Sequence, residues 1–91
     1  MAPRCPLGKI LATPGAMDAL RASGESPHKF IKRHGNGDWG LIDQEDARSN
    51  DSALLSGDRI LSAYRTATGV KLWIITEADR SATTLLLPKE Y

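Results

Sequence analysis

The chain has few of the residues that cross-link small domains or carry cofactors. Among its 91 residues there is one cysteine, Cys5, and aromatic residues make up only 5%. One cysteine can form neither an intrachain disulfide nor a cysteine-rich zinc site. Small secreted domains normally depend on such cross-links, so we expect a reducing, cytoplasmic location.

An excess of charge of one sign and long hydrophobic runs are also lacking. Lys and Arg total 12 and Asp and Glu total 11, which leaves a formal charge of +1. That balance argues against a strongly electrostatic nucleic-acid binder. Apolar runs such as Trp73–Ile75 and Leu85–Leu87 are far shorter than the roughly 20 residues that span a bilayer. No apolar signal segment opens the chain, so we expect no membrane partner.

Motifs that bind nucleotides or metals are missing as well. The sequence has neither the phosphate loop G-x-x-x-x-G-K-[ST] nor the dinucleotide motif G-x-G-x-x-G. The two histidines, His28 and His34, lie six positions apart, a spacing that does not put them on one face of a helix. No nucleophile elbow accompanies the serines. We therefore expect no cofactor and no metal site, and we lean towards a protein that is not an enzyme.

The N-terminal half carries the start and stop signals of three short helices. Two starts combine a Ser or Thr cap with a proline, and the third is an aspartate followed by acidic residues. A glycine follows each helix and can take the left-handed conformation that ends it. The predicted helices are Pro14–Ser23 after Thr13, Pro27–His34 after Ser26, and a third from the cap Asp43 to Leu55 or Ser56.

The sequence of the C-terminal third predicts a β-sheet. Arg59–Thr66, Val70–Glu77 and Ala82–Leu87 are rich in β-branched and aromatic residues and are joined by short turns, which is typical of a β-meander. Lys9–Ala12 is a candidate fourth strand. We predict an α+β fold with about three short helices packed on a three-stranded antiparallel meander. Residues 1–91 would form a single domain, with residues 1–7 as a flexible tail.

The middle strand of this meander is apolar on both sides. Leu72 and Ile74 alternate with Trp73 and Ile75, so both faces of the strand need cover. We expect a central strand in which Trp73 is mostly buried. The helices would cover one face, and a partner or a second copy of the chain would cover the other.

The glycine-rich segment His34–Gly40 is the first candidate binding site. Glycine costs backbone entropy, which a chain accepts where unusual dihedral angles or a close approach are needed. His34, Asp38 and Trp39 could hydrogen-bond to a partner and stack on it. The alternative is structural: Gly35 ends a helix, Asp38 makes a turn, and Trp39 fills the core.

The turn at Asp79 and Arg80 is the second candidate. A tight hairpin presents its side chains rigidly, and arginine is frequent in binding hot spots. Arg80 has no apolar neighbour in the turn, so Arg80→Ala is expected to change stability by no more than about 0.5 kcal/mol. The alternative is a polar turn with an internal ion pair of little energetic weight.

The basic helix around Lys29, Lys32 and Arg33 is the third candidate, for contacts with phosphates or with an acidic partner. The alternative is a solvated face whose cations complement the helix dipole. A metal-free ribonuclease also stays open, because several suitable side chains lie on or near the expected sheet. They are Arg59, Tyr64, Arg65, Lys71 and Arg80.

Two stretches of the chain carry distinctive sequence motifs. They are His34–Gly40, and Leu61–Arg65 followed by Lys71–Pro88. Together they resemble a group of small bacterial proteins of unknown function, often labelled plasmid-related. The resemblance implies a bacterial cytoplasmic protein carried on plasmids, phages or genomic islands, and it implies no catalytic residue.

These observations favour a small non-catalytic module that binds another protein. Inhibition of a host defence or restriction complex is one specific form of that function. Two alternatives stay open, a ribonuclease toxin of a toxin–antitoxin pair and a weak nucleic-acid-binding accessory protein. Formation of a homodimer also stays open.

Overall fold

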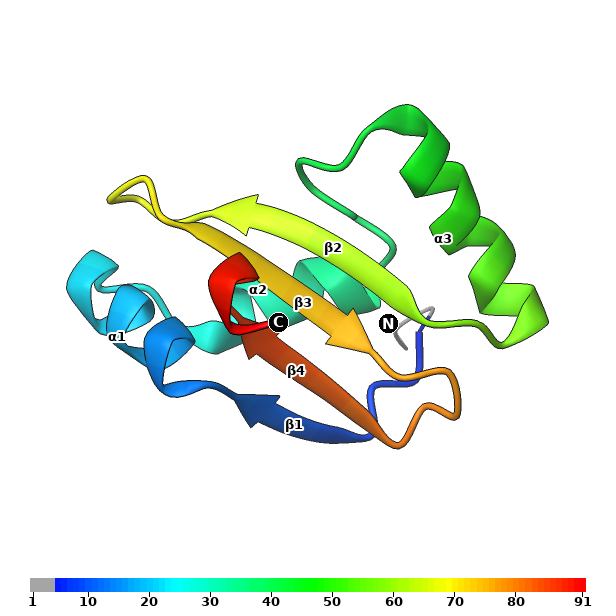
Figure 1. The fold of residues 1–91 in the computed structure, drawn as a ribbon, viewed down its shortest axis with the longest axis horizontal. Helices are drawn as coiled ribbons and strands as arrows, with labels where there is room; N and C mark the ends of the chain where they lie inside the picture. The colour runs from blue at the N-terminus through cyan, green and yellow to red at the C-terminus, as the bar shows by residue number, and fades with distance from the viewer. Residues whose placement is uncertain (1–4) are drawn as a thin grey trace.

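Three helices and a four-stranded mixed sheet make up residues 5–91, the part of the chain that the computed structural model describes (Figure 1). The α+β class predicted from the sequence is confirmed. In chain order the elements are β1 (Lys9–Ala12), α1 (Pro14–Ser23), α2 (Pro27–Gly35), α3 (Gln44–Ser56), β2 (Ile60–Arg65), β3 (Lys71–Thr76), β4 (Ala82–Leu86) and the short 3-10 helix η1 (Pro88–Glu90).

The three helices begin at the predicted caps. The Thr13 and Ser26 side chains each accept a hydrogen bond of 3.2 Å from a backbone N–H of the first turn. The Asp43 carboxylate accepts one of 2.8 Å from the N–H of Asp46. These bonds satisfy amide groups that have no partner inside the helix. The helix starts were predictable because each one depends on a few adjacent residues.

The sheet has the order β1-β4-β3-β2. β2, β3 and β4 form the antiparallel meander that the sequence predicts. β1 is the fourth strand, and it pairs in parallel with β4, with Ile10 opposite Thr83. Parallel pairing requires a long connection between the two strands, and the three helices with β2 and β3 provide it. The sheet is therefore mixed, which the sequence pattern did not indicate.

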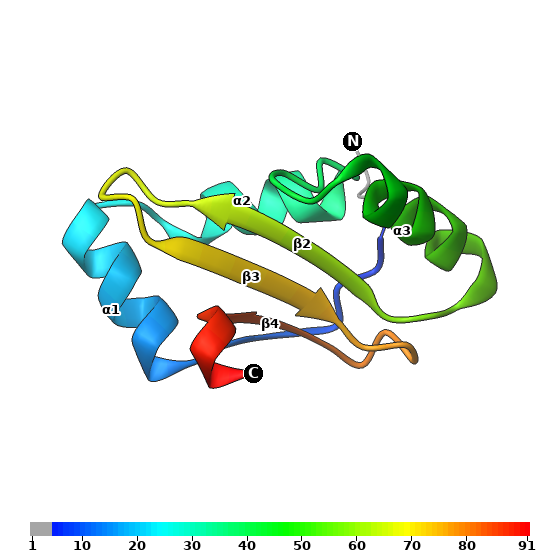
Figure 2. The same ribbon diagram turned by 45° about the horizontal axis from the view of Figure 1, so that its top comes forward.

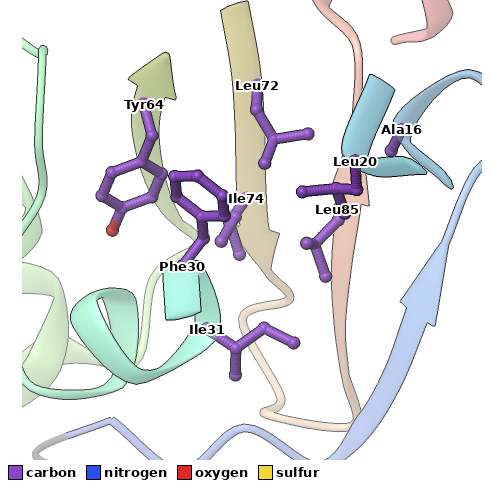
Figure 3. Close-up of a cluster of buried hydrophobic side chains, with 8 residues drawn as sticks. All are labelled: Ala16, Leu20, Phe30, Ile31, Tyr64, Leu72, Ile74 and Leu85. Atoms are coloured by element: carbon purple, nitrogen blue, oxygen red, sulfur yellow. The ribbon is translucent and has the colours of Figure 1, made fainter. Parts of the chain in front are cut away.

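The helices pack on one face of the sheet, which we call the helix face. α2 lies behind the sheet and η1 in front of it, in both views (Figures 1 and 2). α3 lies beside β2. The main core cluster joins α1 and α2 to the sheet (Figure 3), and it consists of Ala16, Leu20, Phe30, Ile31, Tyr64, Leu72, Ile74 and Leu85.

A second cluster fills the space between α3, β2 and the N-terminal segment, with Cys5, Trp39, Ala53 and Ile60 buried in it. Cys5 is fully buried, and its N–H donates to the carbonyl of Gly35 at 3.1 Å. The expectation of a flexible tail is therefore wrong for Cys5 and Leu7, which pack in the core, whereas Pro6 between them is exposed. The remaining part of the expected tail, residues 1–4, lies outside the described residues.

None of the helices in residues 5–91 is long and apolar enough to cross a membrane.

Candidate functional site

His34 lies inside the protein and not on a binding loop. Its side chain is fully buried, with Nδ1 2.6 Å from Ser62 Oγ and Nε2 2.7 Å from Thr76 Oγ1. Burial lowers the pKa of His34 to about 4, because a charged imidazole would lose its hydration there. A direct contact between His34 and a partner is therefore ruled out in this fold, contrary to the first sequence hypothesis.

The protons of this buried network can be assigned by counting donors. Thr83 donates its hydroxyl proton to the carbonyl of Leu7 at 2.7 Å, so it must accept from Thr76 at 2.8 Å. Thr76 has then used its only proton and accepts from Nε2–H of His34. A neutral imidazole with Nε2 protonated leaves Nδ1 to accept from Ser62. His34 therefore joins α2 to three strands in one defined tautomer.

Ser62 and His34 have the contact of a nucleophile and its base. Both side chains are fully buried, as are Thr76 and Thr83, so no substrate reaches the hydroxyl. The pair is structural. The sequence analysis did not single out Ser62, Thr76 or Thr83, although a polar residue at an inward strand position was a visible signal.

Trp39 is a core residue, in agreement with the structural alternative in which its side chain fills the core. It is 5% exposed, and its indole N–H donates to the Asp51 carboxylate at 3.0 Å. Its ring meets that of His34 edge-on at 5.5 Å between centroids. The binding role predicted for Trp39 is replaced by a packing role, because the indole fills the space between α2, α3 and β2.

The segment after Trp39 covers the outer edge of β2. Residues 39–41 exchange backbone hydrogen bonds of 2.7 and 3.2 Å with Ala63. Gly40 has φ +72°, and a Cβ there would lie 2.0 Å from the Ala63 carbonyl oxygen, so only glycine fits. Further along, the Asn50 amide bonds both backbone groups of Leu61, at 2.7 and 3.3 Å.

Asp38 stays exposed, but its charge is paired. Arg33 Nε lies 2.7 Å from Asp38 Oδ2, and this hydrogen bond lowers the pKa of Asp38. The Arg33 guanidinium lies over the Tyr64 ring at 4.7 Å, and Tyr64 donates to the Asp38 carbonyl at 2.7 Å. The Arg33–Asp38 ion pair therefore links the last turn of α2 to the loop that follows it.

The basic helix offers fewer free cations than its sequence suggests. Lys29 lies 2.6 Å from Glu25, and this hydrogen bond is the main cause that lowers the pKa of Glu25 to about 2. Arg33 pairs with Asp38. Of the three predicted contacts, only Lys32 is exposed without a carboxylate partner within residues 5–91.

Arg80 folds back onto the protein and does not project from its turn. The residue has φ +62°, and its guanidinium donates to the carbonyls of Ala53 and Asp58 at 2.8 Å and of Glu77 at 3.1 Å. The sequence predicted that Arg80 would face a partner and would have no structural role. That prediction is wrong. The left-handed backbone turns the side chain towards the end of α3.

Asp79 remains at the surface of the same turn. Its carboxylate accepts from the side chain and the backbone N–H of Ser81, the latter at 2.9 Å, which lowers the pKa of Asp79. An open hollow lies beside it, lined by Glu77, Ala78, Asp79 and Ser81. Asp79 is the more exposed member of the second candidate site, because Arg80 is partly buried.

The sheet face opposite the three α-helices is called the open face. Among residues 5–91, η1 and the following Tyr91 lie over it (Figures 1 and 2), and Ala63, Ile75 and Leu86 of this face are at most 5% exposed. The strand registers arrange its side chains in rows. The two apolar rows are Leu11, Thr84, Ile75, Leu61 and Leu86, Trp73, Ala63; the charged rows at either end are Lys9, Ala82, Glu77, Arg59 and Lys71, Arg65.

Tyr91 crosses this face from Arg59 to Trp73. Its hydroxyl accepts a hydrogen bond from Arg59, and its ring meets Trp73 edge-on at 6.0 Å. Glu90 fixes the segment by accepting from the Thr13 hydroxyl at 2.5 Å, and this bond lowers the pKa of Glu90. Trp73 is consequently partly buried and belongs to neither core cluster, which is less burial than the sequence analysis expected.

The five side chains considered for a ribonuclease do not converge. Tyr64 is 1% exposed on the helix face, and burial raises its pKa to about 12. Arg65 is the next residue along the strand and therefore points to the opposite face, where Lys71 and Arg59 also lie. Arg80 is bound to backbone carbonyls. Substrate could not reach Tyr64 and Arg65 at one place.

Comparison of the chain with protein-family models, with curated proteins and with solved structures finds no match in any of the three. Within residues 5–91, no three side chains of His, Cys, Asp or Glu gather closely enough to hold a metal ion. Function is therefore inferred from the geometry of the surface.

Proposed function

We propose that this protein is a small non-catalytic module that binds another protein through the open face of its sheet. The observation that carries the proposal is the one-sided cover of a sheet whose strands are apolar on both faces. Leu11 on the edge strand β1 is 42% exposed, and Trp73 on β3 and Leu61 on the opposite edge strand β2 are partly accessible on the same face. Exposed apolar side chains grouped on one face, with charges around them, are typical of interaction surfaces.

The burial of the candidate catalytic groups supports a binding role over catalysis. The Ser62–His34 pair and Tyr64 lie on the helix face, out of reach of a substrate. A ribonuclease would need an acid and a base beside a bound phosphate. On the open face the accessible groups are arginines, lysines and aliphatic side chains, with Glu77 as the carboxylate and Tyr91 as the phenol beside Arg59.

A bacterial mobile element and a cytoplasmic setting complete the proposal. Their support is the resemblance carried by His34–Gly40, Leu61–Arg65 and Lys71–Pro88 to plasmid-related bacterial proteins. On such an element, the specific form of binding we propose is inhibition of a host defence or restriction complex. The proposed partner is then a subunit of that complex.

The experiment compares two matched variants in capture from the native host. Leu11→Asp places a charge on the open face, and Leu55→Asp places the same charge on α3, where Leu55 is 92% exposed. The wild type and Leu55→Asp should retain the same partner, and Leu11→Asp should lose it. A binding isotherm with the purified partner then measures the loss.

Two results would reject the proposal. One is equal retention of the partner by Leu11→Asp, provided that its melting curve matches that of the wild type. The other is degradation of mixed RNA by the purified protein that disappears on Arg65→Ala or Lys71→Ala. The second result would favour the ribonuclease toxin.

A further inference from the structure

Two like charges face each other on the open face. Arg65 on β2 is directly opposite Lys71 on β3, and both side chains are exposed. Like charges opposite each other in an antiparallel pair are destabilising. Arg65 donates to the carbonyl of Gly69 at 3.1 Å, but neither cation pairs with a carboxylate within residues 5–91. The fold therefore holds a positive pair that it does not neutralise.

The other end of the open face is also basic. Arg59 and Lys9 lie there, with Glu77 as the acidic residue of the same row. Arg59 precedes Arg65 by six positions, which corresponds to about 20 Å along a strand at about 3.3 Å per residue. The aliphatic rows lie between the two ends. Tyr91 lies over the face between Arg59 and Trp73 and accepts the Arg59 hydrogen bond, so Arg65 and Lys71 form the basic end that is open to a partner.

From this arrangement we propose that the open face takes an acidic, extended segment of a protein partner. Carboxylates of the segment pair with Arg65 and Lys71, and its apolar side chains lie on the accessible parts of Trp73 and Leu61. The inference rests on the proposed binding function and adds the chemistry of the partner.

The side chains of the middle rows favour protein over nucleic acid. Stacked bases need aromatic faces, and the rows supply one aromatic ring, Trp73, whose neighbour Tyr91 already meets it edge-on. The other apolar side chains are aliphatic. A second copy of the chain is disfavoured because two open faces would bring their own cations together.

The test measures peptide binding by fluorescence anisotropy. The probe is a labelled ten-residue peptide with two glutamates at each end and alternating valine and threonine between them. A second peptide has lysine in place of glutamate. The acidic peptide should bind the wild type saturably below 1 mM, more weakly as salt rises, and the lysine peptide should not bind.

Charge reversal supplies the matched comparison. Arg65→Glu with Lys71→Glu should weaken acidic-peptide binding at least tenfold and should create binding of the lysine peptide. Arg21→Glu with Arg48→Glu makes the same change in net charge at exposed positions of α1 and α3. That control should change the affinity less than twofold.

Several results would overturn the inference. They are no saturable binding of the acidic peptide below 1 mM, an equal loss in the control variant, or tighter binding of a ten-nucleotide oligouridylate than of the peptide. Sedimentation that shows a dimer abolished by the Arg65 and Lys71 reversal would assign the face to a second copy. If the acidic peptide fails while Leu11→Asp still loses the native partner, only the acidic chemistry is wrong and the proposed function stands.

Discussion

At the scale of single residues, several side chains that could have formed a binding site instead make hydrogen bonds within the protein. His34 is held by two hydroxyl groups, Trp39 by a carboxylate, and Arg80 by three carbonyls. Within residues 5–91 every buried side-chain nitrogen or oxygen has a hydrogen-bond partner. A buried polar group that lost its partner would cost about 1–3 kcal/mol, so these residues are needed for folding.

His34 should make stability depend on pH. Its pKa is about 4 in the folded protein and 6.5 in the unfolded chain, so the unfolded form binds more protons between these values. The contribution of neutral His34 to the free energy of unfolding is complete above pH 6.5 and is lost as the pH falls towards 4. We expect the free energy of unfolding at pH 4.5 to be about 2–3 kcal/mol below that at pH 7, measured by urea denaturation.

The control for this prediction is His34→Gln, which keeps hydrogen-bonding capacity but does not titrate. It should be less stable than the wild type at pH 7, and between pH 6.5 and 5.5, above the range in which carboxyls such as Glu25 titrate, its stability should change much less than that of the wild type. A variant with the wild-type slope would show that another group titrates in this window.

Arg80→Ala should be destabilising, in contrast to what the sequence alone suggested. The substitution removes hydrogen bonds to the carbonyls of Ala53, Asp58 and Glu77, and it leaves alanine at φ +62°. We expect a loss of about 1–3 kcal/mol in thermal or urea unfolding. Arg48→Ala, an exposed arginine of α3, should change stability by less than about 0.5 kcal/mol. Similar losses of stability in the two variants would show that the hydrogen bonds of Arg80 to the three carbonyls do not stabilise the fold.

At the scale of elements, the two edges of the sheet differ. The edge of β2 is covered by residues 39–41 and by the Asn50 amide, which blocks pairing with another chain. β1 forms the other edge, and all four of its residues are exposed. α3 therefore acts partly as a cover for a strand, which explains how a helix with a thin apolar stripe is kept in place.

Asn50→Ala should weaken this attachment. The change leaves the backbone N–H and C=O of Leu61 without their partners, at 3.3 and 2.7 Å in the present structure. We expect a loss of about 1–3 kcal/mol, with faster hydrogen exchange at the Leu61 amide. Ser49→Ala, at the exposed neighbouring position, serves as the control. An unchanged exchange rate in Asn50→Ala would show that α3 is held by packing alone.

At the scale of the whole molecule, the sheet has one buried and one open side. Adjacent residues of β3 belong to the two sides: Leu72 is fully buried in the main core cluster, whereas Trp73 lies on the open face. The stability of the domain therefore comes mainly from the helix face. On the open face Ala63, Ile75 and Leu86 are also buried, and the accessible parts of Leu11, Leu61 and Trp73 are what the proposed partner would cover.

Truncation of these two neighbours should show the asymmetry. Leu72→Ala should cost about 2–5 kcal/mol, the usual range for a fully buried leucine. Trp73→Ala should cost less than Leu72→Ala, although more atoms are removed, because tryptophan keeps part of its surface in water and leaves no closed cavity. The measurement is urea unfolding of both variants, and the reverse order would place Trp73 in the core.

Local features of the structure could be predicted from the sequence. Caps such as Thr13, Ser26 and Asp43 bond to amides two or three residues away, so a short window contains the whole signal. The meander strands follow from alternation and short turns, and β1 was foreseen as a candidate strand. These elements depend on neighbours along the chain, and that information is present in the sequence itself.

Only the tertiary structure decided which surfaces are left for function. Thr83 bonds Leu7 across 76 positions, Glu90 bonds Thr13 across 77, and His34 bonds Thr76 across 42. Such contacts select the parallel partner of β1 and draw His34 inwards, and bonds to the carbonyls of Ala53 and Asp58 draw Arg80 inwards. Short-range patterns do not contain them, because each depends on the packing of segments whose separation in the sequence says nothing about their distance in space.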